Sequence, residues 1–199
     1  MMDQLLHWDE FFFLFFNGLH TSFLDKFFYF ITLIPVWIPL YLSIILLIIH
    51  QYKKKSWLII CTFIFTILCT DQTCNLLKHS VKRPRPSHTE ALATQIHLHQ
   101  YPDGTYYYGG AYGFPSAHAA NAMAFAVLVI FFLTKRKKIL SAVFIIWALL
   151  LAYSRIYLGV HYPLDIVTGL ILGCCWGLFW LYLYQRLFLK IFFKETPSI

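Results

Sequence analysis

The stretch "ILSAVFIIWALLLAYSRIYLGVHYPLDIVTGLILGCCWGLFWLYLYQR", residues 139–186, is two apolar runs joined by a short polar segment, 154–165. Each run is close to the roughly 20 residues that a helix needs to cross a bilayer. Charged groups beside hydrocarbon are costly, so the Arg155, His161 and Asp165 placed between the runs indicate a functional site. The alternative is a loop whose charges lie in water and mark the end of a helix.

The composition of the whole chain is that of a membrane protein. Its 199 residues are 59% hydrophobic and 13% charged, with a mean hydropathy of +0.63. Soluble domains have about 45–50% apolar and about 25% charged residues. The apolar residues here come in long blocks rather than in a period of two or 3.6. We therefore predict an all-α membrane protein with a single integral membrane domain over residues 1–199.

Five spans are predicted from these blocks. They cover about 30–50, 56–77, 116–133, 139–157 and 163–186. The run "FFFLFFNGL", 11–19, is too short to span and predicts an N-terminal interfacial helix that ends at Asn17-Gly18. The fold class is thus a bundle of five transmembrane helices preceded by an interfacial helix, with the loop 79–115 as an external cap over the site.

The placement of the basic residues predicts the topology. The net charge of +7 comes largely from 53–55, 135–138 and Arg186, Lys190 and Lys194 in the tail. Short Lys/Arg-rich loops stay in the cytoplasm, so the N-terminus, 79–115 and 158–162 are predicted outside. This distribution argues against a nucleic-acid partner. The five cysteines lack metal-ligand spacing and are interpreted as packing residues.

Small residues recur on two of the predicted spans. Gly169, Gly173 and Gly177 are spaced four apart, and alanines crowd residues 117–126. Such stripes let membrane helices approach closely. Packing inside the bundle is the favoured use, and a homodimer face is the alternative.

Two polar clusters precede the segment quoted above. "KHSVKRPRP", 78–86, contains Lys78 and Arg85, and an ammonium with a forked guanidinium suits a phosphate. These cations could instead merely snorkel to the interface. "FPSAHAAN", 114–121, predicts a helix capped by Ser116, whose first N–H groups, at Ala117 and His118, form an anion site. A lone His is otherwise an ordinary interfacial residue.

The third cluster is the quoted segment itself. Pro163 suits the first turn of the last span, and Asp165 lies four residues after His161, near enough to hold one ring nitrogen. The other nitrogen is then free as a nucleophile or base. By the predicted topology the three clusters face the same side. Their cations, histidines and carboxylate suit phosphoryl transfer without a metal or another cofactor.

In order, Lys78-x6-Arg85-Pro86, Pro115-Ser116-Ala117-His118 and Ser154-Arg155-x5-His161-x3-Asp165 resemble the three-part signature of the type 2 phosphatidic acid phosphatase superfamily. The resemblance implies that Lys78, Arg85, Arg155 and the Ser116–Ala117 backbone bind phosphate. It implies that His161 is the nucleophile, Asp165 positions it, and His118 is the general acid. The chain departs from the family at Ala117, where Gly is usual.

The leading functional hypothesis is a membrane phosphatase that hydrolyses a lipid phosphate or pyrophosphate through a phosphohistidine. Its substrate would resemble phosphatidate, phosphatidylglycerophosphate, undecaprenyl pyrophosphate or lipid A. It would act at the external face of a bacterial inner membrane. The alternatives are a phosphotransferase that uses an acceptor lipid and a non-catalytic lipid-binding protein of the same fold. His97 and His99 suggest a metal, but spacing supplies no further ligand, so a solvated loop is the interpretation.

Overall fold

The computed structural model describes residues 2–134 and 137–193. The predicted cytoplasmic positions Lys135, Arg136 and Lys194 lie outside these residues. Within them the chain is helices and loops, and its extended pairing is limited to two isolated bridges, Pro84 with Tyr112 and Gln100 with Tyr106. The prediction of an all-α protein is confirmed.

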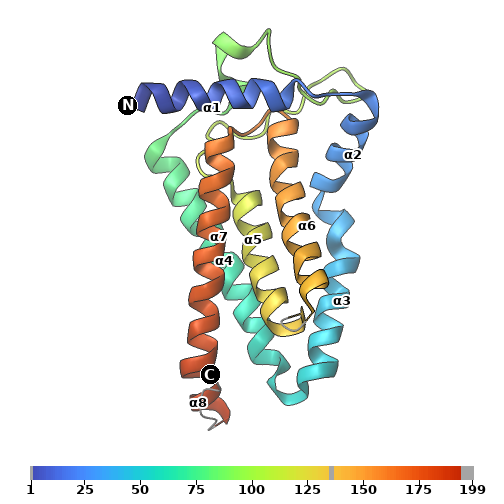
Figure 1. The fold of residues 1–199 in the computed structure, drawn as a ribbon, viewed down its shortest axis with the longest axis vertical. Coiled ribbons are helices and arrows are strands. Elements are labelled where there is room, and N and C mark those ends of the chain that lie inside the picture. Colours follow the sequence, from blue (N-terminus) through green and yellow to red (C-terminus); the bar gives the residue numbers. More distant parts are fainter. Residues whose placement is uncertain (1, 135–136, 194–199) are drawn as a thin grey trace.

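Helix α1, Met2–Asn17, lies across one end of the bundle (Figure 1). It ends where Asn17-Gly18 predicted, but it begins well before the predicted Phe11. Phe13 packs edge-on against Tyr162, with ring centroids 5.3 Å apart, whereas Phe12 is exposed. Asn17 does more than end the helix, because its buried amide donates 2.9 Å to the carbonyl of Tyr157 and joins α1 to the bundle.

The first predicted span is two helices. The structure has α2 at Ser22–Thr32 and α3 at Ile34–Tyr52, with the break at Leu33 in extended conformation. Pro35 lies in the first turn of α3, where its missing N–H costs no helical hydrogen bond. The predicted span 30–50 begins before this break, so its predicted first residue is wrong.

The remaining helices follow the predicted spans closely. Helix α3 turns through Lys53–Lys55 into α4, Ser56–Val81. The others are α5 at Ala117–Val129 with a π turn at Ile130–Thr134, α6 at Lys138–Tyr157, α7 at Pro163–Leu183 with a π turn at Tyr184–Phe188, and α8 at Leu189–Phe193. The three polar clusters identified in the sequence thus lie at helix ends.

The glycine stripe of α7 packs on α5 inside the chain. A β-carbon on Gly169 would lie 2.5 Å from the carbonyl oxygen of Ser116, and one on Gly173 would collide with the backbone of Ala120. Close backbone approach therefore fixes the start of α5 against α7. The homodimer stays a prediction, and it would need a face other than these glycines.

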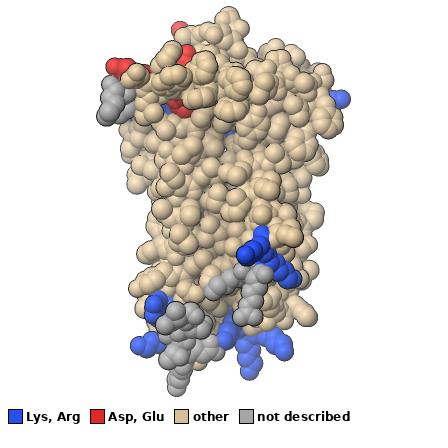
Figure 2. Space-filling view, viewed as in Figure 1, with Lys and Arg blue, Asp and Glu red and all other residues tan. Residues whose placement is uncertain are grey.

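Four helical stretches are long and apolar enough to cross a membrane: Ile34–Val81, Ala117–Thr134, Lys138–Tyr157 and Pro163–Phe193. The first is 48 residues long and contains both α3 and α4. Figure 2 shows most of the visible Lys and Arg at the end where α3 joins α4, Asp and Glu at the opposite end, and between them a belt that is almost free of these charged residues. The chain is an integral membrane protein.

Candidate active site

The three polar clusters meet at the end of the bundle that α1 crosses. The end of α4, the start of α5 and the α6–α7 connection all lie there (Figure 1). The positive charges of Lys78, Arg85 and Arg155 act on the ring of His161, which is 2% exposed. The same three charges and His161 act on His118. The fold therefore brings together five of the residues that the sequence predicted for the site.

His161 and Asp165 form a buried pair. Nδ1 of His161 lies 3.3 Å from Oδ2 of Asp165, and the carboxylate is fully buried. Oδ2 also accepts a hydrogen bond from the backbone N–H of Tyr162, at 3.0 Å. Pro163 begins α7, as its fixed φ favours, and this places Asp165 in the first turn. The predicted contact is present, and Nε2 of His161 is the nitrogen it leaves free.

Sequence reasoning missed the partner of the second carboxylate oxygen. Arg83 donates from Nη1 to Oδ1 of Asp165 at 2.9 Å and from Nη2 to Oδ2 of Asp9 at 2.6 Å. Asp9, on α1, also accepts the N–H of Leu164 at 2.7 Å. The guanidinium lies 4.1 Å from the ring centroid of Tyr162. Helix α1 is thereby linked through one arginine to the His161–Asp165 pair.

Burial and the ion pair with Arg83 act in opposite directions on the charge state of Asp9, and burial is the larger effect. Burial raises the pKa of Asp9, while the hydrogen bond and charge of Arg83 act in the opposite direction. A buried carboxylate with two donors is stabilised in its charged form. The sequence signal for this link is the presence of four cations within "KHSVKRPRP", 78–86, more than the two assigned to phosphate.

Arg85 is held by the backbone on both sides. Its Nε donates to the carbonyl of Tyr112 at 3.1 Å and its Nη1 to that of Val160 at 3.4 Å. Arg85 is 8% exposed, and its burial and the charge of Arg155 both lower the pKa of Arg85 from its ordinary value. The guanidinium stays charged at neutral pH. Two neutral carbonyls leave this charge uncompensated, as an anion site requires.

Arg155 is more deeply buried than its place at a helix end suggested. It is 3% exposed, and it donates from Nη1 to Thr32 at 2.6 Å and from Nη2 to the Tyr107 hydroxyl at 2.8 Å. Its Nε is a buried donor without a partner among the described residues. Thr32 lies at the break between α2 and α3, so that break supplies a partner for Arg155. A buried cation with neutral partners favours a bound anion.

The start of α5 has the predicted capping geometry. Ser116 is fully buried, its Oγ accepts the N–H of Ala119 at 3.4 Å, and its own N–H donates 3.0 Å to the carbonyl of Asp165. The N–H groups of Ala117 and His118 belong to the first turn and have no partner within the helix. Lys78 is half-buried, without a hydrogen bond among the described residues. These donors complete the positive cluster.

Burial, and after it the charges of the positive cluster, keep His161 neutral. Its burial lowers the pKa of His161 well below 6.5, and the charges of Arg85, Arg155 and Lys78 lower it further. A hydrogen bond to the backbone of Gly113 acts in the opposite direction and raises the pKa of His161. An unprotonated imidazole held by a carboxylate is a competent nucleophile at neutral pH.

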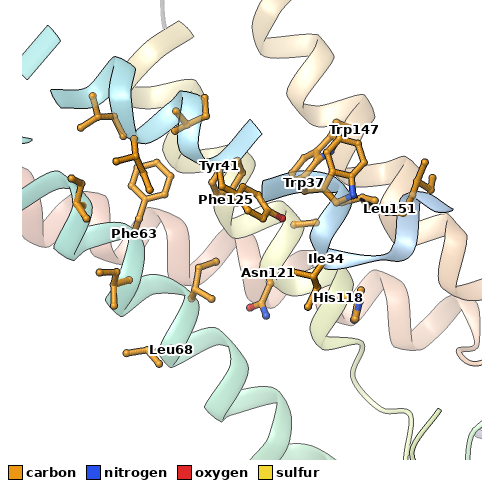
Figure 3. A pocket seen from close by; sticks show the side chains of 18 of the residues that line it. Ile34, Trp37, Tyr41, Phe63, Leu68, His118, Asn121, Phe125, Trp147 and Leu151 are labelled. Carbon is orange, nitrogen blue, oxygen red and sulfur yellow. Dashed lines mark hydrogen bonds between the residues drawn. The ribbon is translucent and has the colours of Figure 1, made fainter. Parts of the chain in front are cut away.

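An apolar cavity of about 530 Å³ opens beside this cluster, between α3, α4, α5 and α6. Figure 3 shows its walls, built from aromatic and aliphatic side chains that include Trp37, Tyr41 and Phe63. His118 lines the same cavity, so it joins the polar cluster to a space suited to hydrocarbon. Cavities of this kind are common ligand sites.

The described residues contain no group of three metal-ligating His, Cys, Asp or Glu side chains. The interpretation of His97 and His99 as a solvated loop is wrong. His97 pairs with Asp25 at 2.7 Å and stacks on His20, while His99 stacks on Tyr29 with centroids 3.9 Å apart. These rings pack the loop 79–115 against the segment around α2.

The chain is similar to known membrane phosphatases. The chain is 36% identical over 187 residues to a lipid A 4'-phosphatase of Bacteroides thetaiotaomicron, covering 92% of this chain and 80% of that protein. It is 29% identical to a lipid A 4'-phosphatase of Porphyromonas gingivalis, covering 93% and 77%. The crystal structure of LpxE from Aquifex aeolicus matches with a TM-score of 0.65 and 26% identity, covering 85% of this chain and 92% of that one.

A phosphatidylglycerolphosphate phosphatase of PAP2 type from Bacillus subtilis shares the fold, with a TM-score of 0.68, 22% identity and coverage of 92% and 88%. The prediction that the chain is a membrane lipid phosphatase is confirmed. A family model described as the PAP2 superfamily matches residues 57–189, which contain all three polar clusters. The chain belongs to the PAP2 superfamily.

Proposed function

We propose that the chain hydrolyses the phosphate monoester of a membrane lipid by transferring the phosphoryl group first to His161 and then to water. The observation that carries this proposal is the buried His161–Asp165 pair among three cations. A neutral imidazole with one nitrogen held at 3.3 Å from a carboxylate has its other nitrogen available for attack.

The proposed phosphate site consists of Lys78, Arg85, Arg155 and the first turn of α5 at Ser116–Ala117. Together they bring three positive charges and the positive end of a helix dipole. Positively charged groups stabilise the equatorial oxygens of a transferring phosphoryl group, the part that metal ions play in other phosphoryl-transfer enzymes. This supports a reaction that needs no divalent metal.

The chemical steps use the two histidines. Nε2 of His161 attacks phosphorus, the ester P–O bond breaks, and His118 gives its proton to the leaving lipid oxygen. Water then attacks phosphorus, its proton passes to His118, the P–N bond breaks, and inorganic phosphate leaves. The negative charge of a bound phosphate favours the protonated form of His118 that the first step requires.

A lipid substrate is supported by the cavity that His118 shares with the cluster. A head-group phosphate at the cations would leave the hydrocarbon chain to fill the apolar space. Among candidate substrates we propose a lipid A-type glycolipid phosphate, because two of the relatives act on lipid A.

We also propose that the site faces the outside of the cell. Helices α3 and α4 would each cross once, giving five crossings, with the Lys53–Lys55 turn in the cytoplasm. In a variant without native cysteines, Thr105→Cys should react with a membrane-impermeant thiol reagent on intact cells, and Lys54→Cys should not. Reaction of Lys54→Cys alone would show that the topology is the opposite of the one proposed.

The function is tested by phosphate release from purified protein in excess chelator. The substrates tested are a lipid A, phosphatidate, phosphatidylglycerophosphate and undecaprenyl pyrophosphate, each without an added acceptor lipid. Release from a lipid phosphate, lost in His161→Gln, supports hydrolysis. Release that requires an added acceptor lipid indicates a phosphotransferase. Activity lost in chelator and restored by magnesium would overturn the mechanism.

A further inference from the structure

Helix α1 presents an aromatic surface that the rest of the described chain leaves uncovered. Trp8 is 51% exposed, Phe12 44% and Phe15 55%, and Leu5 continues the same face toward the start of the helix. Single exposed apolar side chains are ordinary, but a contiguous group of them is typical of an interaction surface. The first half of α1 also lacks support from the protein, because residues 3–8 are all exposed.

The side chains of α1 fall into three sectors around the helix. The buried sector packs against the bundle and contains Asp9, Phe13 and Asn17. The apolar sector is exposed and contains Leu5, Trp8, Phe12 and Phe15. The polar sector is exposed and contains Asp3, His7 and Glu10. Since successive residues are rotated by about 100°, the apolar sector is centred roughly 120° from the buried one, and the polar sector roughly 90° from it in the other direction.

This division suits a helix that lies along the boundary between lipid head groups and hydrocarbon. Helix α1 runs across the bundle axis (Figure 1), hence parallel to a membrane that the long helices cross. With its buried sector on the bundle, α1 can turn the apolar sector to hydrocarbon while the polar sector faces water. Helices with Trp, Phe and Leu on one face and polar residues on another bind at this boundary.

The lipid-facing surface of the spans continues up to α1. Val167, on α7, is 50% exposed and lies one turn after Leu164, whose N–H donates to Asp9 of α1. Phe23, at the start of α2, is 76% exposed. The apolar sector thus adjoins side chains that themselves face the bilayer, which identifies lipid as its partner.

The position of α1 bears directly on the His161–Asp165 pair. Asp9 lies between Trp8 and Phe12 and accepts a hydrogen bond of 2.6 Å from Arg83, which in turn holds Asp165. The protein contacts of α1 lie at Asp9 and after it. A short helical stretch without packing is only marginally stable in water, so the stretch before Asp9 depends on another partner.

We propose that the apolar sector of α1 docks into the boundary between head groups and hydrocarbon at this end of the bundle, and that the docking keeps Asp9 on Arg83 and Asp165 in place. The membrane surface is then part of the support of the active site. The effect on turnover rests on the proposed function, whereas the docking itself does not.

The docking is tested with nitroxide labels in vesicles of phosphatidylethanolamine and phosphatidylglycerol. In protein without native cysteines, one label is attached at Phe12→Cys and another at His7→Cys, in the polar sector. Molecular oxygen, which concentrates in hydrocarbon, should relax the label at 12 more strongly, and a water-soluble nickel chelate the label at 7. Equal relaxation of both by the chelate would overturn the docking. Spin–spin broadening at 12 would also overturn it, because a second copy would then cover this face.

The effect on turnover is tested by making the apolar sector polar. In Phe12→Ser/Phe15→Ser we expect kcat for phosphate release in the same vesicles to fall about 10-fold with little change in KM, because orientation at the site is weakened and substrate contacts are kept. The matched control is Phe12→Leu/Phe15→Leu, which stays apolar and should keep kcat close to wild type. Thermal unfolding identifies a variant that fails to fold, and Phe12→Ser alone then replaces the pair. Wild-type kcat in a folded serine variant would overturn the coupling.

A double-mutant cycle tests whether the effect passes through Asp9. In Asp9→Asn the link to Arg83 is already weakened, so the two serine substitutions should lower kcat further by less than about twofold. A further loss as large as in wild type would overturn this route. If no lipid releases phosphate, the proposed function fails and the NMR signal of His161 decides instead. The serine variant should shift this signal and the leucine control should not; an unchanged signal in the serine variant would overturn the coupling.

Discussion

Arg83 donates a hydrogen bond of 2.9 Å to Oδ1 of Asp165, while His161 lies against the other oxygen of the same carboxylate. The carboxylate is therefore fixed from two sides, and Arg83 is itself fixed by Asp9 of α1 at 2.6 Å. Asp165 can orient His161 only while its own rotamer is held. We infer that Arg83 is a positioning residue that acts through Asp165, with α1 as its support.

Replacing Arg83 should therefore lower kcat far more than it raises KM. In Arg83→Met the carboxylate loses its charged partner, and a misplacement of about 1 Å at a reacting group costs about 10²-fold in rate. Arg83→Lys should recover part of this loss, because an ammonium can still contact one carboxylate. Steady-state kinetics with the preferred lipid measure both constants. A rise in KM with kcat unchanged would place Arg83 on the substrate instead.

Two substitutions of Asp9 separate its charge from its capping role. Asn keeps an oxygen for the N–H of Leu164, whereas Ala removes both the cap and the ion pair with Arg83. We expect Asp9→Asn to lower kcat with little change in thermal stability. Asp9→Ala should lower kcat and also reduce the free energy of unfolding by about 0.5–2 kcal/mol, the usual worth of a helix cap. Equal kcat in wild type and both variants would exclude a link from α1 to the site.

His161 should remain neutral below pH 6.5 in the free enzyme, because burial and three nearby cations lower its pKa. Histidine-labelled protein in micelles reports this by NMR, with the signal assigned by its loss in His161→Gln. Inorganic phosphate should move the midpoint to higher pH, since a bound anion offsets the cations and stabilises the imidazolium. A midpoint at or above 6.5 without phosphate would contradict the neutral nucleophile.

The α5–α7 contact should tolerate a methyl group at one glycine and not at another. At Gly173 a β-carbon meets the backbone of Ala120, which cannot move without shifting α5. At Gly177 the nearest atoms are Cγ1 and Cβ of the Val127 side chain, at 2.9 and 3.1 Å, and the nearest backbone atom is 3.5 Å away. Overpacking costs about 1–3 kcal/mol, so Gly173→Ala should unfold at a clearly lower temperature than Gly177→Ala. Equal melting temperatures would mean that the helices separate readily.

The parts of the structure that were predictable are those encoded within a few residues. The apolar runs predicted the helices, and Pro163 and Ser116 predicted where two of them begin. The spacing of four residues predicted the contact between His161 and Asp165. Each depends on local backbone geometry, which short patterns specify.

The parts that were missed depend on contacts between distant segments. Arg83 and Asp9 are 74 residues apart, and no periodicity relates an interfacial helix to the loop after α4. Likewise the break at Leu33 matters because Thr32 then meets Arg155, more than a hundred residues away. A single sequence contains these charges and hydroxyls, but only the packed bundle pairs them.

A methyl group at Gly113 should disable the site while leaving the fold intact. A β-carbon there would lie 2.8 Å from Oδ2 of Asp165 and 3.6 Å from Nδ1 of His161, so the carboxylate must move away from the imidazole. We expect Gly113→Ala to lower kcat by about 10²-fold or more, since orientation of the nucleophile is lost. The matched control is Gly110→Ala, because a β-carbon at Gly110 meets nothing within 4 Å. Thermal unfolding and phosphate release are measured for both variants; wild-type kcat in Gly113→Ala would show that the His161–Asp165 contact does not limit turnover.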